Sequence, residues 1–119
     1  MEKEKSSQGK WNERLFIQLI VTFQAAAMQQ MGKLKNPLTD KIEKNMEQAS
    51  LSIDMLDMIK EKTRGNLSKD EEKLLDFTLS ELKMNYVEEM RKAEEGKKEK
   101  EKAREEKKPD EGPGKTRDN

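Results

Sequence analysis

The chain contains neither cysteine nor histidine, so any chemistry must use carboxylates, amines or hydroxyls. Thiolate nucleophiles, imidazole bases and the usual zinc ligands are thereby excluded from this chain. The best-spaced carboxylates belong to Asp54 and Asp57, which share one face of an expected helix. Two monodentate carboxylates without further ligands make only a weak site for a hard cation. We therefore predict no catalytic residue, no cofactor and no metal site, and a protein that is not an enzyme.

A second polar segment, residues 62–71, reads Lys-Thr-Arg-Gly-Asn-Leu-Ser-Lys-Asp-Glu and lies between two expected helices. Gly65 suits the left-handed conformation that closes a helix, and Ser68 with Glu71 has the spacing of a capping box. Such a loop could also hold a phosphate at the next helix N-terminus, but acidic residues 70–72 crowd that end with negative charge. We interpret the segment as a structural turn, formed by Lys62, Thr63, Gly65, Asn66, Ser68 and Glu71.

Hydrophobic spacing predicts three helices that position these polar residues. The first covers residues 12–31, with Asn12 as its N-cap, and is apolar around so much of its circumference that it requires two neighbours. Lysines before this apolar run imitate a secretory signal, but acidic and glutamine residues make both parts too polar. The run, residues 15–28, is also shorter than the about 20 apolar residues that span a membrane. We therefore interpret it as a core helix.

The second predicted helix covers residues 40–63 after a break at Pro37, with Thr39 or Asp40 as its cap. Two apolar stripes run along it. The first is a heptad-like seam of Ile42, Met46, Ala49, Ile53, Leu56 and either Ile59 or Lys60. The second consists of Leu51, Met55 and Met58. Methionine-rich stripes serve either as ordinary core or as adaptable recognition surfaces, so this helix is expected to touch more than one partner.

The third predicted helix begins at Lys69, and its apolar stripe ends at Met90. Leu75, Leu79, Leu82 and Tyr86 form that stripe. From residue 91 to residue 108 lysine and glutamate dominate, and many opposite charges lie three or four residues apart, which favours a solvated helix. The proline- and glycine-containing residues that follow end any such helix.

The chain balances 25 Lys and Arg residues against 25 Asp and Glu residues over its 119 residues. It therefore exerts no net attraction on nucleic acid or on an anionic membrane. A hydrophobic content of 31% in a chain of this length supports one small domain. The absence of cysteine fits a reducing compartment, and we expect a cytoplasmic protein.

Five short residue patterns are spaced along residues 37–87. They read Pro37-x-Thr39, Met46-Glu47-x-Ala49, Ile53-Asp54-x-Leu56-x-Met58, Lys62-Thr63-x-Gly65-Asn66-Leu67-Ser68-x-x-Glu71-x-x-Leu74-Leu75 and Leu82-Lys83-x-x-Tyr86-Val87. Together with the apolar first helix, this series resembles a family of short bacterial helical proteins known as domain of unknown function 1844. The resemblance covers residues 15–88 and implies a bacterial setting, but no activity, cofactor or catalytic residue.

These observations predict an all-α fold in which the first helix packs on a hairpin of the other two. A flexible N-terminus over residues 1–11, a helical domain over 12–90 and a charged, partly helical to disordered tail over 91–119 are expected. A core this thin scarcely offsets the conformational entropy of ordering the chain, so we expect a homodimer to complete it. The residues predicted to form the interaction surface are Phe16, Leu19, Ile20, Phe23, Met55 and Met58.

Surplus apolar helix surface and missing chemistry favour a non-enzymatic oligomerisation or protein-interaction module. One alternative is a peripheral membrane protein that inserts Trp11 and the first helix, with Lys10 and Arg14 near the headgroups; the lack of a lysine-rich polar face counts against it. Another is a weak nucleic-acid binder that uses residues 91–108, which contain no aromatic residue and mix acids with bases. We expect neither membrane nor nucleic acid to be a partner.

Overall fold

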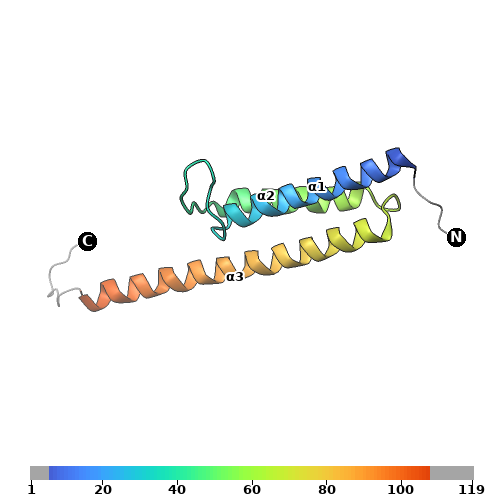
Figure 1. The fold of residues 1–119 in the computed structure, drawn as a ribbon. Helices are drawn as coiled ribbons and strands as arrows, with labels where there is room; N and C mark the ends of the chain where they lie inside the picture. The colour runs from blue at the N-terminus through green and yellow to red at the C-terminus, as the bar shows by residue number, and fades with distance from the viewer. Residues whose placement is uncertain (1–5, 108–119) are drawn as a thin grey trace. The chain divides into compact units, whose positions relative to one another are not determined.

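Within residues 6–107, which the computed structural model describes, the secondary structure consists of three helices and no strand. They are α1 (Ser7–Gln30), α2 (Met46–Lys62) and α3 (Lys69–Lys107). The link between α1 and α2 and the turn between α2 and α3 lie at opposite ends of the α1–α2 pair (Figure 1), so the two helices are antiparallel. The all-α prediction is confirmed.

The helix α1 begins earlier than the sequence analysis predicts. Ser6 is its N-cap, and the Ser6 Oγ accepts a hydrogen bond from the Gly9 N–H at 3.0 Å. Asn12 lies inside the helix, where its Oδ1 accepts a hydrogen bond from the Gln8 side chain. The predicted start at Asn12 is therefore wrong, because a serine further upstream satisfies the free amides of the first turn. The segment predicted to be flexible, residues 1–11, contains the beginning of α1; residues 1–5 lie outside the described part of the chain.

The helix α2 begins later than predicted, because residues 36–41 form a closed turn. The Asn36 N–H donates to the Lys41 carbonyl at 2.8 Å, and Asp40 has a left-handed φ of 59°. Asp40 therefore cannot start a helix, and Asn45 caps α2 instead by accepting from the Gln48 N–H at 3.0 Å. Ile42, predicted to lie in the core seam, is correspondingly exposed.

The turn between α2 and α3 confirms the predicted capping pattern. Gly65 has a φ of 84°, in the left-handed region that glycine tolerates. The Ser68 N–H donates to Glu71 Oε1 at 2.8 Å, and the Glu71 N–H donates to Ser68 Oγ at 3.1 Å. This reciprocal capping box starts α3 at Lys69, as predicted.

Replacing Ser68 with alanine is expected to lower the free energy of unfolding by about 1 kcal/mol, because the first turn of α3 loses its cap. The change also removes the hydrogen bond from Ser68 Oγ to Glu13 Oε2 at 3.2 Å. Chemical denaturation of the purified protein measures the difference. As a control, Ser80→Ala on an exposed position of the same helix should change stability by less than about 0.5 kcal/mol. Equal effects of the two substitutions would contradict the capping role.

The hydrophobic core lies between α1, α2 and the first half of α3. All three segments contribute side chains to it, and its buried residues are Ile20, Ala27, Met31, Ala49, Ile53, Leu56, Leu75, Leu79 and Leu82. Phe16 and Phe23 of α1 pack against this core from its edge. The helix α1 thus has two helical neighbours, as its broad apolar circumference predicts.

The chain divides into two compact units, with the boundary between Val87 and Glu88. In the second unit, residues 88–107 are helical and strongly charged. Ion pairs along this helix join Arg91 to Glu95 at 2.9 Å and Lys92 to Glu89 at 3.4 Å. These pairs have the three- and four-residue spacing that stabilises solvated helices. The remainder of the predicted tail, residues 108–119, lies outside the described part of the chain.

Candidate functional site

The most distinctive exposed surface borders the contact between α1 and α2. We call it the α1–α2 surface, and it consists of Leu15, Leu19, Leu51, Met55 and Met58. The exposed fractions of these side chains range from 38% for Leu19 to 49% for Leu51. Each is therefore half-buried by its own fold and half available to solvent.

The position of this surface follows from one polar contact between the two helices. The Gln30 side-chain amide and the Ser52 hydroxyl form a hydrogen bond of 2.7 Å across the α1–α2 contact. On α1, Ala26 lies seven residues after Leu19 and four residues before Gln30. These intervals place all three residues on the same face of the helix. On α2, Met55 lies one turn beyond Ser52. The apolar side chains of both helices therefore lie on the same side of the pair.

The α1 part of this surface is free of charge. Residues 15–32 contain no Asp, Glu, Lys or Arg, although 42% of the chain consists of these residues. Its exposed polar side chains, such as Gln18 and Thr22, are neutral. An uncharged, half-apolar helix face is unusual in so charged a chain, and desolvating it carries no charge-burial cost.

The structure separates the predicted interaction residues into three groups. Leu19, Met55 and Met58 are exposed and belong to the α1–α2 surface. Phe16 and Phe23 are partly buried against the core. Ile20 is completely buried and belongs to the core, so its assignment to an interaction surface is wrong.

Exposed apolar side chains also lie beside the contact between α1 and α3, where the sequence predicts no site. The Gln24 side chain donates to Glu81 Oε1 at 3.3 Å and marks this contact. One turn before these residues lie Val21 on α1 and Phe77 on α3, and Met84 lies one turn after Glu81. The seven-residue interval between Phe77 and Met84 was the signal in the sequence.

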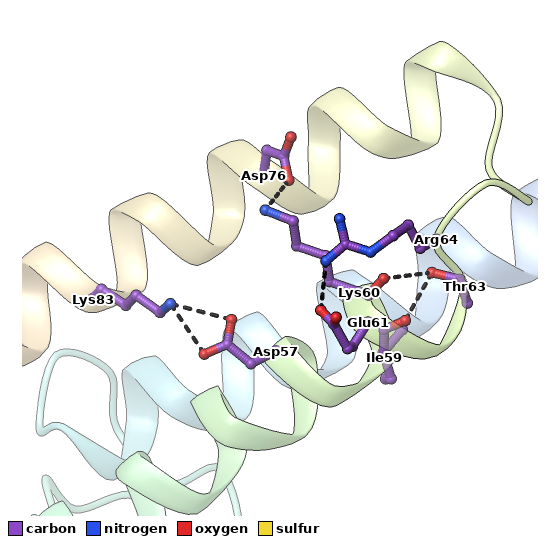
Figure 2. Close-up of polar contacts among 8 residues, drawn as sticks. All are labelled: Asp57, Ile59, Lys60, Glu61, Thr63, Arg64, Asp76 and Lys83. Atoms are coloured by element: carbon purple, nitrogen blue, oxygen red, sulfur yellow. Dashed lines mark hydrogen bonds and ion pairs between the residues drawn. The ribbon is translucent and has the colours of Figure 1, made fainter.

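Two ion pairs border the contact between α2 and α3. Lys60 Nζ lies 2.9 Å from Asp76 Oδ1, and Lys83 Nζ lies 3.0 Å from Asp57 Oδ2 (Figure 2). All four side chains are partly exposed, and pairs of this kind contribute little net stability. Their value lies in fixing the register of α3 against α2.

The pKa of Lys60 is raised, first by its hydrogen bond to Asp76 and then by the attraction between the two charges. Desolvation and the nearby Arg64 act in the opposite direction. Since folding raises this pKa, the contribution of the pair to stability is present at neutral pH. It is lost only as the pH rises through the raised pKa of Lys60.

Two hollows adjoin this contact. An open groove of about 320 Å³ is lined by Ser50, Ile53, Asp54, Asp57, Lys83, Tyr86 and Val87. Asp54 and Asp57, the carboxylates with helix-face spacing, both line it, and Asp57 is paired with Lys83. Within residues 6–107, no group of three or more His, Cys, Asp or Glu side chains is placed to hold a metal ion.

The second hollow is a small pocket of about 40 Å³ at the turn between α2 and α3. Its basic residues are already engaged, because Lys60 pairs with Asp76 and Arg64 pairs with Glu61 at 2.6 Å. The Thr63 hydroxyl donates to the Ile59 carbonyl at 2.7 Å (Figure 2) and closes the end of α2. Lys62 lies in the last turn of α2, and the Asn66 N–H donates to the Thr63 carbonyl at 2.8 Å. These contacts are structural.

Fold and surface together define a small three-helix domain with a half-exposed, charge-free apolar face. Among the described residues, no helix has the length and apolar character needed to cross a membrane. The chain belongs to the family described as Domain of unknown function (DUF1844), whose model matches residues 13–88. The resemblance found in the sequence is thereby confirmed, and the matched segment ends at the boundary between the two units. Neither the curated proteins nor the solved structures contained a match.

Proposed function

We propose that this protein is a non-enzymatic helical oligomerisation module of a bacterial cytoplasm, and that its α1–α2 surface binds a second copy of the chain. The observation that carries the proposal is the charge-free face of α1, which continues into the half-exposed Leu51, Met55 and Met58 of α2. Contiguous exposed apolar surface of this kind marks interaction sites in soluble proteins. In a symmetric dimer, both copies of each of these side chains are removed from water.

The alternative functions receive less support from the same residues. Beside the α1–α2 surface, Lys62 lies at the end of α2, whereas an interfacial helix would present a row of basic side chains to lipid headgroups along its polar face. In residues 88–107 acidic residues lie among the basic ones, and two of the basic side chains, Arg91 and Lys92, are paired with Glu95 and Glu89. A nucleic-acid site would instead present unneutralised cations to phosphates.

Sedimentation equilibrium tests the proposal, with a dimer expected at twice the chain mass of 13.9 kDa. Met55→Lys should weaken dimerisation about 100-fold or more, because each copy loses roughly 1.5 kcal/mol of apolar burial and the loss is counted twice. Met84→Lys is the matched control: it makes the same exchange at an exposed position on α3 and should leave the association constant unchanged.

Two results would overturn the proposal. A single species at the monomer mass up to high micromolar concentration would remove self-association altogether. A dimer that Met84→Lys disrupts and Met55→Lys does not would move the interface to the α1–α3 side. Circular dichroism of both variants confirms that each remains folded.

A further inference from the structure

A charged residue near each end of α2 lies in line with the α2 part of the α1–α2 surface, and the pattern formed by all of these residues matches an antiparallel copy of itself. Glu47 lies in its first turn and Lys62 in its last turn, with Leu51 and Met58 between them. Steps of three and four residues place all of these side chains and Met55 on one face. Along the helix, Glu47 and Lys62 lie at equal distances on either side of the centre of this face. Leu51 and Met58 also lie at equal distances from that centre.

Building on the proposed function, we propose that two copies associate about a two-fold axis that passes beside Met55, with each α2 antiparallel to that of its partner. Leu51 then lies opposite Met58 of the partner subunit. Glu47 lies within reach of the partner subunit's Lys62, and the symmetry repeats both contacts. In a parallel arrangement, Glu47 would instead lie against the partner subunit's Glu47, and Lys62 against the partner subunit's Lys62. Like charges would then repel each other at both ends of the interface.

The helix α1 fits the same axis. Gln30 contacts Ser52 at 2.7 Å, and the two helices are antiparallel. Ala26 lies one turn before Gln30 on α1, and Met55 and Leu56 lie one turn after Ser52 on α2. Because the helices are antiparallel, Ala26 lies beside Met55 and Leu56. At this level the face of α1 beside α2 presents only neutral side chains, Thr22, Ala26 and Gln29. Two copies of α1 can approach closely there without bringing like charges together.

Asp54 is the charged residue nearest the proposed axis. It lines the groove between α2 and α3, together with Lys83 and Asp57, and so lies on the flank of α2 that is away from α1. The axis therefore passes beside Met55, with Asp54 at the edge of the interface and the complementary charges of Glu47 and Lys62 at the two ends.

Disulfide trapping tests this arrangement cleanly, since the chain has no cysteine of its own. Met55→Cys and Ala26→Cys are each expected to form a disulfide-linked dimer alone, because each residue faces its own copy across the axis. A disulfide requires Cα atoms within about 7 Å. Met84→Cys supplies the rate of collisional cross-linking, and the two axial variants should react at least about ten-fold faster at concentrations where the protein is dimeric.

The alternative stacking, in which α1 of one copy lies on α2 of the other, predicts a disulfide only when the Ala26→Cys and Met55→Cys proteins are mixed. That pattern would overturn the antiparallel arrangement while leaving the proposed function intact. A dimer without either cross-link would do the same. If the protein sediments as a monomer, both the arrangement and the proposed function fail.

A charge exchange provides an independent measurement. Glu47→Lys and Lys62→Glu should each weaken dimerisation several-fold, because each creates like-charge contacts at both ends of the interface. The double variant restores opposite charges and should return to within about two-fold of the parent dissociation constant. Additive weakening in the double variant would contradict the pairing of Glu47 with the partner subunit's Lys62.

Discussion

Replacement of Leu56 by alanine is expected to lower the free energy of unfolding by about 2–5 kcal/mol. Leu56 is fully buried on α2, in the core that α2 shares with α1 and α3. Removing most of its side chain forfeits apolar burial and leaves a cavity, because backbones held by helical hydrogen bonds close the gap only in part. For a domain of this size, such a loss is a large fraction of the total stability.

Urea denaturation at a fixed protein concentration measures this effect, since the proposed dimerisation would contribute to the apparent stability. The control is Leu38→Ala, which makes the same change at a side chain that is 92% exposed. It should alter stability by less than about 0.5 kcal/mol. Similar losses for the two variants would mean that Leu56 does not occupy the centre of the core.

Replacement of Ala27 by leucine is expected to destabilise the protein by about 1–3 kcal/mol. Ala27 is completely buried on the side of α1 that meets both neighbouring helices. The additional carbons have no free volume to occupy, so α1 must move away from its neighbours or side chains must leave their preferred rotamers. The hydrophobic gain of the larger side chain is therefore outweighed by strain.

The alanine triplet at residues 25–27 contains its own control. Ala25 lies on the exposed side of the same helix, and leucine is nearly as good a helix former as alanine. Ala25→Leu should therefore leave the free energy of unfolding within about 0.5 kcal/mol of the parent value. A thermal or urea unfolding series in which Ala25→Leu is the more damaging change would contradict the burial pattern of α1.

Local sequence signals predicted those features that depend on a few neighbouring residues. The capping box of Ser68 and Glu71 and the left-handed Gly65 were predicted correctly, because hydrogen bonds within one turn of chain fix them. The same reasoning failed at Asn12 and Asp40. Each is a good capping residue by type, but Ser6 and Asn45 perform the capping in the structure. Residue type narrows the choice of cap, and the surrounding chain selects among the candidates.

The candidate interaction surface was predictable only in part. The stripe of Met55 and Met58 and the surplus apolar character of the first helix were visible in the sequence, and their exposure agrees with an unpartnered face. The burial of Ile20 was not predictable, because its neighbour Leu19 belongs to the same apolar run and either could face the core. The exposure of Phe77 likewise depends on which side of α3 meets α1.

Periodicity and composition were therefore sufficient to predict three helices and to exclude thiol and imidazole chemistry from this chain, and the series of short residue patterns indicated the family. These properties depend on local hydrogen bonding, on side-chain inventory and on residue spacing. Packing assigned each apolar residue of α1 to the core or to the surface, because a helix that is apolar on many sides can be rotated about its axis without changing its own pattern. The contacts of Gln30 with Ser52 and of Gln24 with Glu81 fix that rotation, and they join residues far apart in the sequence.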